Sequence, residues 1–330
     1  MFVGDTIVMN QELFALAQQD LAALEAELLS VVDSPVDLVH KISDHLVQAG
    51  GKRLRPALYF LCARSSGGQP ATMMPLATAI EMIHMATLVH DDVVDSSHTR
   101  RGRPTANSLW GNQMSVLTGD YLFAKAFSLI ATQVNQNMLR VLADVICAMC
   151  EGEIIQNQFI FQLEQSEQEY YARIAKKTAD FIAASCELGA LSAGLTAEAT
   201  NALRQYGYAL GMAFQITDDI LDVTASSAQI GKPAGNDLRQ GIITLPVLRA
   251  LTVADERDSL RSLLEQKVVL NDEEVRQALD IVHASDGVAY AYAKVDGYLQ
   301  QAKEVLPDCL KENFRETFCQ VADFVNLRKC

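Results

Sequence analysis

Apolar residues recur through most of the chain at intervals of three and four positions, the spacing that places them on one face of an α-helix. Turn residues interrupt this pattern repeatedly, so about ten or more helices are expected. No segment of the sequence alternates apolar and polar residues as a half-buried strand does. The sequence therefore predicts an all-α fold with one domain over residues 1–330. The longest expected helices cover about residues 10–32, 71–97, 106–133, 137–161, 166–193 and 197–223.

Composition and charge narrow the range of functions. The 330 residues include 27 Lys and Arg against 41 Asp and Glu, a formal net charge of -14 at pH 7. Nucleic-acid binding is therefore not expected, since it depends on basic side chains that neutralise phosphates. Hydrophobic residues make up 49% and charged residues 21%, as is typical of a folded globular protein. No apolar run reaches the roughly 20 residues of a membrane-spanning helix, and residues 1–26 lack the basic start of a secretory signal.

Seven cysteines are scattered through the chain. An odd, dispersed set favours reduced thiols and a cytoplasmic location. Cys147 and Cys150 have the spacing of a redox or zinc pair, but no second pair accompanies them in the sequence. We therefore expect two buried structural thiols on an apolar helix.

Two aspartate-rich segments with the same spacing lie near the ends of two long predicted helices. At about 100° per residue, Asp91 and Asp95 fall within roughly 40° of each other, with Asp92 beside them. Carboxylates this close repel each other, so each cluster destabilises the protein unless cations bind there. Mg²⁺ held by carboxylates, waters and substrate phosphates suits such a site. The second cluster repeats the spacing with Asp218, Asp219 and Asp222.

A solvated acidic surface is the commoner explanation for any single run of charges. Here the spacing occurs twice, and apolar residues surround both copies, including Val93 and Val94 at the first and Ile220 and Leu221 at the second. The pair of clusters therefore predicts a site that binds a diphosphate through metal ions.

Basic residues suited to a diphosphate occur at intervals. Lys52 and Arg55 lie one helical turn apart, and Arg100 and Arg101 follow the first cluster directly. His84 lies seven residues before the first cluster, on the same helix face, although an isolated histidine there is more often a core residue. Lys177 and Lys232, taken singly, are better explained as ordinary surface charges.

These motifs together resemble the all-trans polyprenyl diphosphate synthases, from about residue 50 to residue 246. The shared segments, in the family's order, are residues 50–56, both aspartate motifs, residues 100–102, Gly152-Glu153 with Gln156, Lys177-Thr178, Gln215 and residues 231–233. The resemblance implies an all-helical isoprenoid synthase fold with a central cavity, and a homodimer. It also implies a Mg²⁺-dependent prenyltransferase that adds isopentenyl diphosphate repeatedly to an allylic diphosphate such as farnesyl or geranyl diphosphate.

The resemblance also assigns roles to single residues. It implies that the six aspartates hold Mg²⁺ on the allylic diphosphate, and that Lys177, Thr178 and Gln215 act catalytically beside it. The residues implied to contact the allylic group are Arg100, Lys177, Thr178, Gln215 and Lys232, and those for isopentenyl diphosphate are Lys52, Arg55, His84 and Arg101.

Product length is inferred from the position five residues before the first aspartate motif, where the family uses an aromatic residue to stop chain growth. This chain has Ala86 there, followed by Thr87, so the resemblance implies a heptaprenyl to nonaprenyl product, in keeping with a quinone side chain. The helical wheel places Thr87, and not Ala86, near the face of Asp91. A shorter-chain geranylgeranyl synthase and the catalytic subunit of a heteromeric heptaprenyl diphosphate synthase remain alternatives.

Other classes of protein fit the sequence less well. Glu81 and His84 have the Glu-x-x-His spacing of di-iron bundles, but that fold needs the motif twice and the sequence has it once. A non-catalytic regulatory subunit would have lost an acidic cluster or its cations, and a terpene cyclase would differ in the second motif. The acidic balance gives no electrostatic attraction to anionic lipid. Peripheral membrane contact nevertheless stays open, because a long prenyl product must eventually leave for a membrane.

Overall fold

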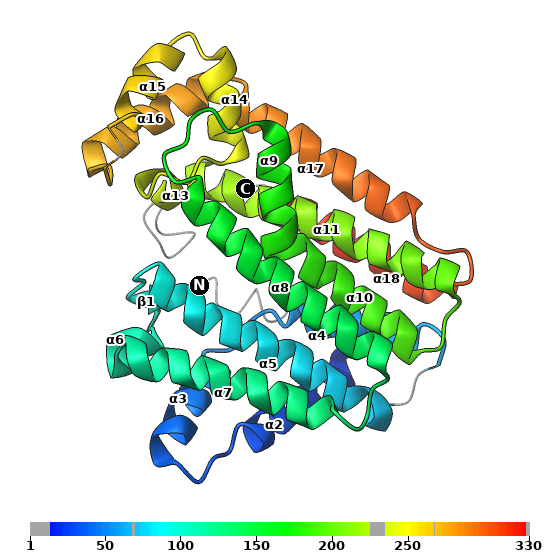
Figure 1. The fold of residues 1–330 in the computed structure, drawn as a ribbon. Helices are drawn as coiled ribbons and strands as arrows, with labels where there is room; N and C mark the ends of the chain where they lie inside the picture. Colours follow the sequence, from blue (N-terminus) through cyan, green and yellow to red (C-terminus); the bar gives the residue numbers. More distant parts are fainter. Residues whose placement is uncertain (1–13, 68–69, 225–234, 267, 328–330) are drawn as a thin grey trace. The chain divides into compact units, whose positions relative to one another are not determined.

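The computed structural model describes residues 14–67, 70–224, 235–266 and 268–327. Helices make up nearly all the regular structure of these residues, in agreement with the predicted all-α class (Figure 1). Among these helices, none is long and apolar enough to span a membrane. The elements in order are η1 (Ala15–Ala17), α2 (Gln18–Val31), α3 (Asp37–Gln48), α4 (Leu54–Arg64), α5 (Pro70–Val94), β1 (Thr99–Arg100), β2 (Arg103–Pro104), α6 (Ala106–Trp110), α7 (Asn112–Ile130), α8 (Gln136–Gln158), α9 (Glu167–Ile174), the π-helical η2 (Ala175–Ala179), α10 (Asp180–Ser192), α11 (Ala197–Thr224), α13 (Asn236–Arg239), α14 (Leu245–Val253), α15 (Arg257–Leu264), α16 (Asp272–Ala284), α17 (Gly287–Glu304) and α18 (Glu312–Leu327).

The chain divides into two compact units. The first unit comprises residues 1–141, 185–200 and 309–317, and the second comprises residues 142–184, 201–308 and 318–330. Each unit has its own set of buried side chains. The single domain over residues 1–330 stays a prediction.

Helix α5 is the central element of the first unit. It runs beside α7, and it also packs against α2, α4 and α6 (Figure 1). Its middle is almost entirely apolar and buried, with Ala77, Ile80 and Ile83 fully inaccessible to solvent. Gly119 of α7 permits the close approach of the two helices, since a Cβ atom there would lie 2.2 Å from Nε2 of His90. The first acidic cluster lies at the C-terminal end of this buried helix.

In the second unit, glycines allow helices to close around the short π-helical segment η2. A Cβ atom on Gly152 of α8 would lie 2.9 Å from the backbone nitrogen of Lys177. On Gly211 of α11, it would lie 2.6 Å from Cα of Ala179. Any larger residue would force these helices apart. Both glycines therefore help to place η2 beside α8 and α11.

The structure differs in detail from the predicted elements in three places. The helix expected over residues 106–133 is interrupted by Gly111, whose φ of 81° is unfavourable for other residues, and so becomes α6 and α7. The helix expected over residues 166–193 is made of α9, η2 and α10. The segment after α5 contains a minimal antiparallel hairpin, β1 with β2, although no strand was predicted. Two strand residues on each side are too few for an alternating pattern.

The expectation of buried thiols at Cys147 and Cys150 is wrong for the single chain. Both residues are exposed on α8, because this helix turns Leu142 and Val145 inward instead. The six cysteines within the described residues are all free thiols, as a reduced protein requires.

Candidate functional site

The first acidic cluster lies where α5 ends. Asp95 follows the last residue of α5 but keeps the helical hydrogen bond, as its N–H donates to the carbonyl of Asp91 at 2.8 Å. Asp91 is half-buried, Asp92 is buried and Asp95 is exposed. Arg100 returns from β1 and donates from Nε to Oδ1 of Asp92 at 2.8 Å. The buried carboxylate of this cluster is therefore paired with a cation of the protein itself.

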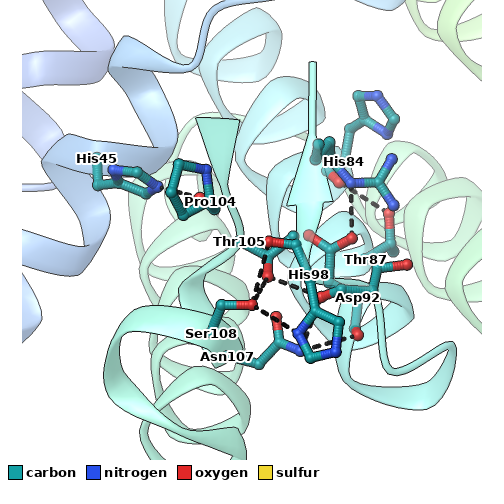
Figure 2. Close-up of polar contacts among 11 residues, drawn as sticks. His45, His84, Thr87, Asp92, His98, Pro104, Thr105, Asn107 and Ser108 are labelled. Carbon is teal, nitrogen blue, oxygen red and sulfur yellow. Dashed lines mark hydrogen bonds and ion pairs between the residues drawn. The ribbon is translucent and has the colours of Figure 1, made fainter. Parts of the chain in front are cut away.

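A network of polar contacts fixes the chain reversal that brings Arg100 to Asp92 (Figure 2). The backbone carbonyl of Asp92 accepts hydrogen bonds from the N–H of Ser97 at 2.9 Å and from Nδ2 of Asn107 at 3.2 Å. The Thr105 hydroxyl donates to the carbonyl of Ser97 at 2.7 Å. These bonds tie the hairpin and the start of α6 to the end of α5 and so limit the motion of the first cluster.

A cationic group lies around the N-terminus of α4. Two of the residues predicted to bind isopentenyl diphosphate are in contact there, since Nη1 of Arg55 and Nε2 of His84 are 3.2 Å apart. The Arg101 guanidinium packs on Gly51, where a Cβ atom would lie 2.6 Å from Nη1. Lys52 precedes the N-cap residue of α4. Since a helix N-terminus presents free N–H groups and positive potential, this arrangement suits a diphosphate.

Burial and neighbouring arginines set the protonation of this group. Burial, followed by the charges of Arg55 and Arg101, holds the pKa of His84 well below its ordinary value. His84 is therefore neutral near pH 7, and its ring can accept a hydrogen bond from Arg55. Burial also lowers the pKa of Arg55 to about 10 and lowers that of Arg101, which leaves both charged at neutral pH.

The same contacts are incompatible with the di-iron alternative. Nη1 of Arg53 donates to Oε1 of Glu81 at 2.7 Å, and His84 lies within hydrogen-bond distance of Arg55. A carboxylate and an imidazole surrounded by guanidinium groups are poor ligands for an iron cation.

The second acidic cluster lies near the C-terminal end of α11. Asp218 is half-buried, whereas Asp219 is buried and accepts hydrogen bonds from the Tyr170 hydroxyl at 2.6 Å and from Nε2 of Gln215 at 2.8 Å. Asp222 accepts the backbone N–H groups of residues 236 and 237, each at 3.1 Å. Among the described residues, the hydrogen-bond donors to these two carboxylates are therefore uncharged hydroxyl, amide and backbone N–H groups.

This environment is unfavourable for negative charge. Burial, then the nearby carboxylate of Asp237, raises the pKa of Asp219 to about 7 and that of Asp222 to about 8. A bound cation would stabilise both carboxylates in their charged form. Within the described residues, no three acidic, histidine or cysteine side chains form a preformed metal cage. An ion at either cluster would thus need oxygens from water or substrate, as Mg²⁺ commonly does.

The residues predicted to act catalytically meet at η2. Thr178 donates from its hydroxyl to Oε1 of Gln215 at 2.7 Å, and Gln215 in turn donates to Asp219. Lys177 forms an ion pair with Glu153 at 2.7 Å. The π-helical turn adds one residue per turn and so changes the direction of side chains, a feature often found at functional sites. The structure thereby connects Thr178, Gln215 and Asp219 in one hydrogen-bonded chain.

Two neighbours of the second cluster were not predicted from the sequence. Tyr170 lies 49 residues before its partner Asp219, so helical spacing could not reveal the contact. Asp237 lies between Gly235 and Gly241 in the sequence, where a single acidic residue carries no pattern. Lys232, which was predicted to contact the allylic group, lies outside the described residues.

The predicted length-determining residues differ in accessibility. Ala86 is fully buried, whereas Thr87 is half-buried and donates its hydroxyl to the carbonyl of His84 at 2.8 Å. The first cluster and the cationic group belong to the first unit, and the second cluster and η2 belong to the second unit. Joint action of the two clusters stays a prediction.

Comparison with known proteins defines first the class and then the family. A solved polyprenyl synthase from Caulobacter crescentus, in complex with calcium and isoprenyl diphosphate, is similar with a TM-score of 0.90 and 36% identity, covering 96% of this chain and 97% of that chain. The all-α architecture is thus the isoprenoid synthase fold. A model of the polyprenyl synthetase family matches residues 36–282, so the chain belongs to that family. It is a transferase that elongates prenyl diphosphates, which confirms the resemblance and the predicted class of enzyme.

Two curated relatives illustrate the range of products. Heptaprenyl diphosphate synthase component 2 of Geobacillus stearothermophilus is 42% identical over 294 residues, 89% of this chain and 91% of that protein. The short chain isoprenyl diphosphate synthase of Methanothermobacter thermautotrophicus is 38% identical over 301 residues, 90% of this chain and 92% of that protein. The chain is therefore similar to the long-chain type and to a shorter-chain enzyme at comparable coverage.

Proposed function

We propose that the protein is a Mg²⁺-dependent synthase of a long all-trans polyprenyl diphosphate, formed by repeated addition of isopentenyl diphosphate to farnesyl or geranyl diphosphate. The observation that carries this proposal is the second acidic cluster, where Asp219 and Asp222 have raised pKa values and uncharged hydrogen-bond donors. Such a cluster favours a divalent cation that also binds diphosphate oxygens. A long prenyl product of this kind would suit a quinone side chain.

The allylic diphosphate is proposed to bind at the two acidic clusters. The metal ions, when bound, would neutralise the negative charge that develops on the departing diphosphate. Arg100, which contacts Asp92 of the first cluster, would bind its remaining oxygens. Lys177 would do the same, since it is the neighbour of Thr178, whose hydrogen bond to Gln215 leads to Asp219 of the second cluster. Lys232, which lies outside the described residues, is proposed for the same role.

When the allylic C–O bond breaks, its electron pair leaves with the diphosphate, and the resulting allylic carbocation is proposed to face the Thr178 and Gln215 side chains. The Thr178 hydroxyl donates a hydrogen bond to Gln215, so the lone pairs of the Thr178 oxygen remain available to the carbocation. Gln215 is held between Thr178 and Asp219, which orients its amide without extra motion. Fixed dipoles of this kind stabilise developing charge, and an apolar surrounding would keep water from quenching it.

Isopentenyl diphosphate is proposed to bind at the N-terminus of α4. Lys52, Arg55 and Arg101 supply positive charge, and the neutral His84 keeps the Arg55 guanidinium in place. Two separate subsites for two diphosphates would hold the reacting carbons together, which removes much of the entropic cost of the reaction.

Incubation of the purified chain with farnesyl diphosphate, labelled isopentenyl diphosphate and Mg²⁺ tests the proposal. We expect products of heptaprenyl to nonaprenyl length on reversed-phase chromatography, and no product when the metal is chelated. Geranylgeranyl diphosphate as the final product would support the shorter-chain alternative. Full activity after chelation would contradict the role of the metal.

The length proposal has its own test. Ala86→Tyr places a large ring in a fully buried position of α5, and we expect it to shorten the product. Thr87→Tyr, at the neighbouring half-buried position, is the comparison. An unchanged product distribution in Ala86→Tyr, with retained activity, would remove Ala86 as a length determinant.

We also propose that the enzyme is a cytoplasmic homodimer. Val116 and Leu117 leave an apolar surface on α7 exposed in the single chain, with exposed fractions of 38% and 55%. The heteromeric alternative is suggested by the relative named as component 2 of a heptaprenyl diphosphate synthase. Light scattering of the chain alone, together with its activity, distinguishes these cases: an inactive chain that needs a second protein would support the heteromer.

A further inference from the structure

The turn before α4 has an unusual backbone conformation at a residue other than glycine. Arg53 has φ 48° and ψ 34°, in the left-handed region, and Gly50 also has a positive φ of 63°. For a residue with a Cβ atom, this conformation costs about 1–2 kcal/mol. It persists only where surrounding contacts hold it. Two of the residues proposed to bind isopentenyl diphosphate lie on either side of this position: Lys52 directly precedes Arg53, and Arg55 follows it by two residues.

The Arg53 side chain supplies such contacts without reaching the surface. It is 7% exposed, and its guanidinium donates to three groups from different segments. Nε donates to Oε1 of Glu25 at 2.6 Å, and Nη2 donates to Oε2 of Glu25 at 3.1 Å. Nη1 donates to Oε1 of Glu81 at 2.7 Å, and Nη2 also approaches the carbonyl of Val47 at 3.3 Å. Arg53 therefore joins α2, the end of α3 and α5 to the turn.

Glu81 connects this anchor to the cationic group. It is 3% exposed, and its second oxygen, Oε2, is buried without a hydrogen-bond partner among the described residues. Its charge nevertheless acts on Arg55 and Arg101, since it is the largest influence that raises the pKa of either guanidinium against the effect of burial. Glu81 thus attracts the Arg55 and Arg101 guanidinium groups electrostatically, although its Oε2 atom accepts no hydrogen bond from them.

We propose that Arg53, held by Glu25 and Glu81, is a positioning residue that fixes the strained turn and thereby presents Lys52 and Arg55 to isopentenyl diphosphate. Arg53 itself does not contact substrate, because its guanidinium is buried and bonded to carboxylates and a carbonyl. The inference rests on the proposed function of this turn as the subsite for isopentenyl diphosphate.

The structure contains a matched ion pair for comparison. Arg64, the last residue of α4, donates from Nε and Nη2 to both oxygens of Asp20 on α2, at 2.8 and 2.7 Å. Arg64 binds a carboxylate of α2 with the same bidentate geometry that Arg53 has with Glu25. It lies, however, at the opposite end of α4 from Lys52. Asp20 is 3% exposed, so loss of this pair also leaves a buried carboxylate.

Steady-state kinetics of Arg53→Gln and Arg64→Gln in the full chain test the proposal. We expect Arg53→Gln to raise the KM for isopentenyl diphosphate by about 10- to 100-fold, because the binding groups are no longer held in place. The KM for farnesyl diphosphate should stay within about threefold, and kcat at saturating isopentenyl diphosphate should fall less than the KM rises. Arg64→Gln should lower the melting temperature without this selective change in KM.

Conservative variants give a second measure if Arg53→Gln folds poorly. Arg53→Lys keeps the charge but cannot reach Glu25 and Glu81 together, so an intermediate KM is expected. Arg53→Gln with Glu81→Gln removes the unpaired buried charge, and it should recover stability but keep the raised KM. Glu25→Gln changes a carboxylate whose side chain is 46% exposed and should have the smallest effect.

Lys52→Gln separates the two levels of the argument. If Lys52→Gln leaves the KM for isopentenyl diphosphate unchanged, the proposed subsite is wrong and the positioning role with it. If Lys52→Gln raises this KM while Arg53→Gln and its double variant change it no more than Arg64→Gln does, only the positioning role is overturned.

Discussion

The two aspartate clusters have the same spacing in the sequence but different electrostatic surroundings. In the first, the buried Asp92 is paired with Arg100 at 2.8 Å. In the second, the buried Asp219 accepts hydrogen bonds from two neutral side chains, Tyr170 and Gln215, and its pKa is raised to about 7. The first cluster is thus partly neutralised by the protein. The second depends more on a bound cation for its charged form.

This difference teaches that identical motifs need not contribute equally to metal binding. Each cluster combines a buried carboxylate that is tied to protein donors with a half-buried carboxylate that is more exposed to solvent. Asp91 and Asp218 are the accessible members that correspond in position. Hydrogen bonds to the buried member orient the cluster, as outer partners do at metal sites.

The largest effect is expected from Asp91→Asn and Asp218→Asn. Each removes an accessible carboxylate, and we expect kcat/KM to fall by about 100- to 1000-fold, the scale seen when a group that stabilises transition-state charge is lost. Initial rates over a range of Mg²⁺ concentrations provide the measurement. If kcat/KM falls in only one of the two variants, only the cluster that this variant changes binds the catalytic metal.

Tyr170→Phe should have a smaller effect that is specific to the second cluster. The variant removes one of the donors to Asp219, so its carboxylate binds a proton more readily and a metal less readily. We expect kcat/KM to fall by about tenfold and the Mg²⁺ requirement to rise. Tyr171→Phe is the matched control, since the Tyr171 hydroxyl donates to Glu167 on the same helix. Equal losses in both variants would contradict a specific role for Tyr170.

Thermal unfolding with inorganic pyrophosphate and Mg²⁺ compares the clusters without catalysis. A ligand at one hundred times its Kd stabilises a protein by about 2.7 kcal/mol. We expect Asp219→Asn to lose more of this stabilisation than Asp92→Asn, because Arg100 already balances the charge of Asp92. The reverse order would mean that the ion pair at the first cluster breaks when metal binds.

The smallest effect concerns the pH dependence of stability at His84. Its pKa is lowered in the folded protein, so the unfolded chain binds a proton that the folded chain does not. Stability from this residue is therefore complete above its unfolded pKa of about 6.5 and is lost as the pH falls below that value. Both proteins should have a lower unfolding free energy at pH 5.5 than at pH 7.5, and the decrease should be smaller in His84→Gln than in the wild type. Urea unfolding at the two pH values measures this, and identical losses would mean that His84 is protonated in the folded state.

The sequence by itself determined the helical class, both aspartate clusters and the order of the basic residues. These features depend on local spacing, which a helix converts directly into a shared face. Local spacing also supported the resemblance that the family comparison confirmed. It misled at Cys147 and Cys150, because an apolar helical pattern does not show which face of α8 is buried, and both cysteines lie on an exposed part of that helix.

Only the tertiary structure decided which residues support those motifs. Tyr170 reaches Asp219 across 49 positions, and Arg53 reaches Glu25 and Glu81 across 28 positions each. Contacts at such separations arise when helices pack, and no periodic pattern within one helix encodes them. The left-handed conformation of Arg53 has the same origin, since packing contacts must offset a local cost that the sequence alone would avoid.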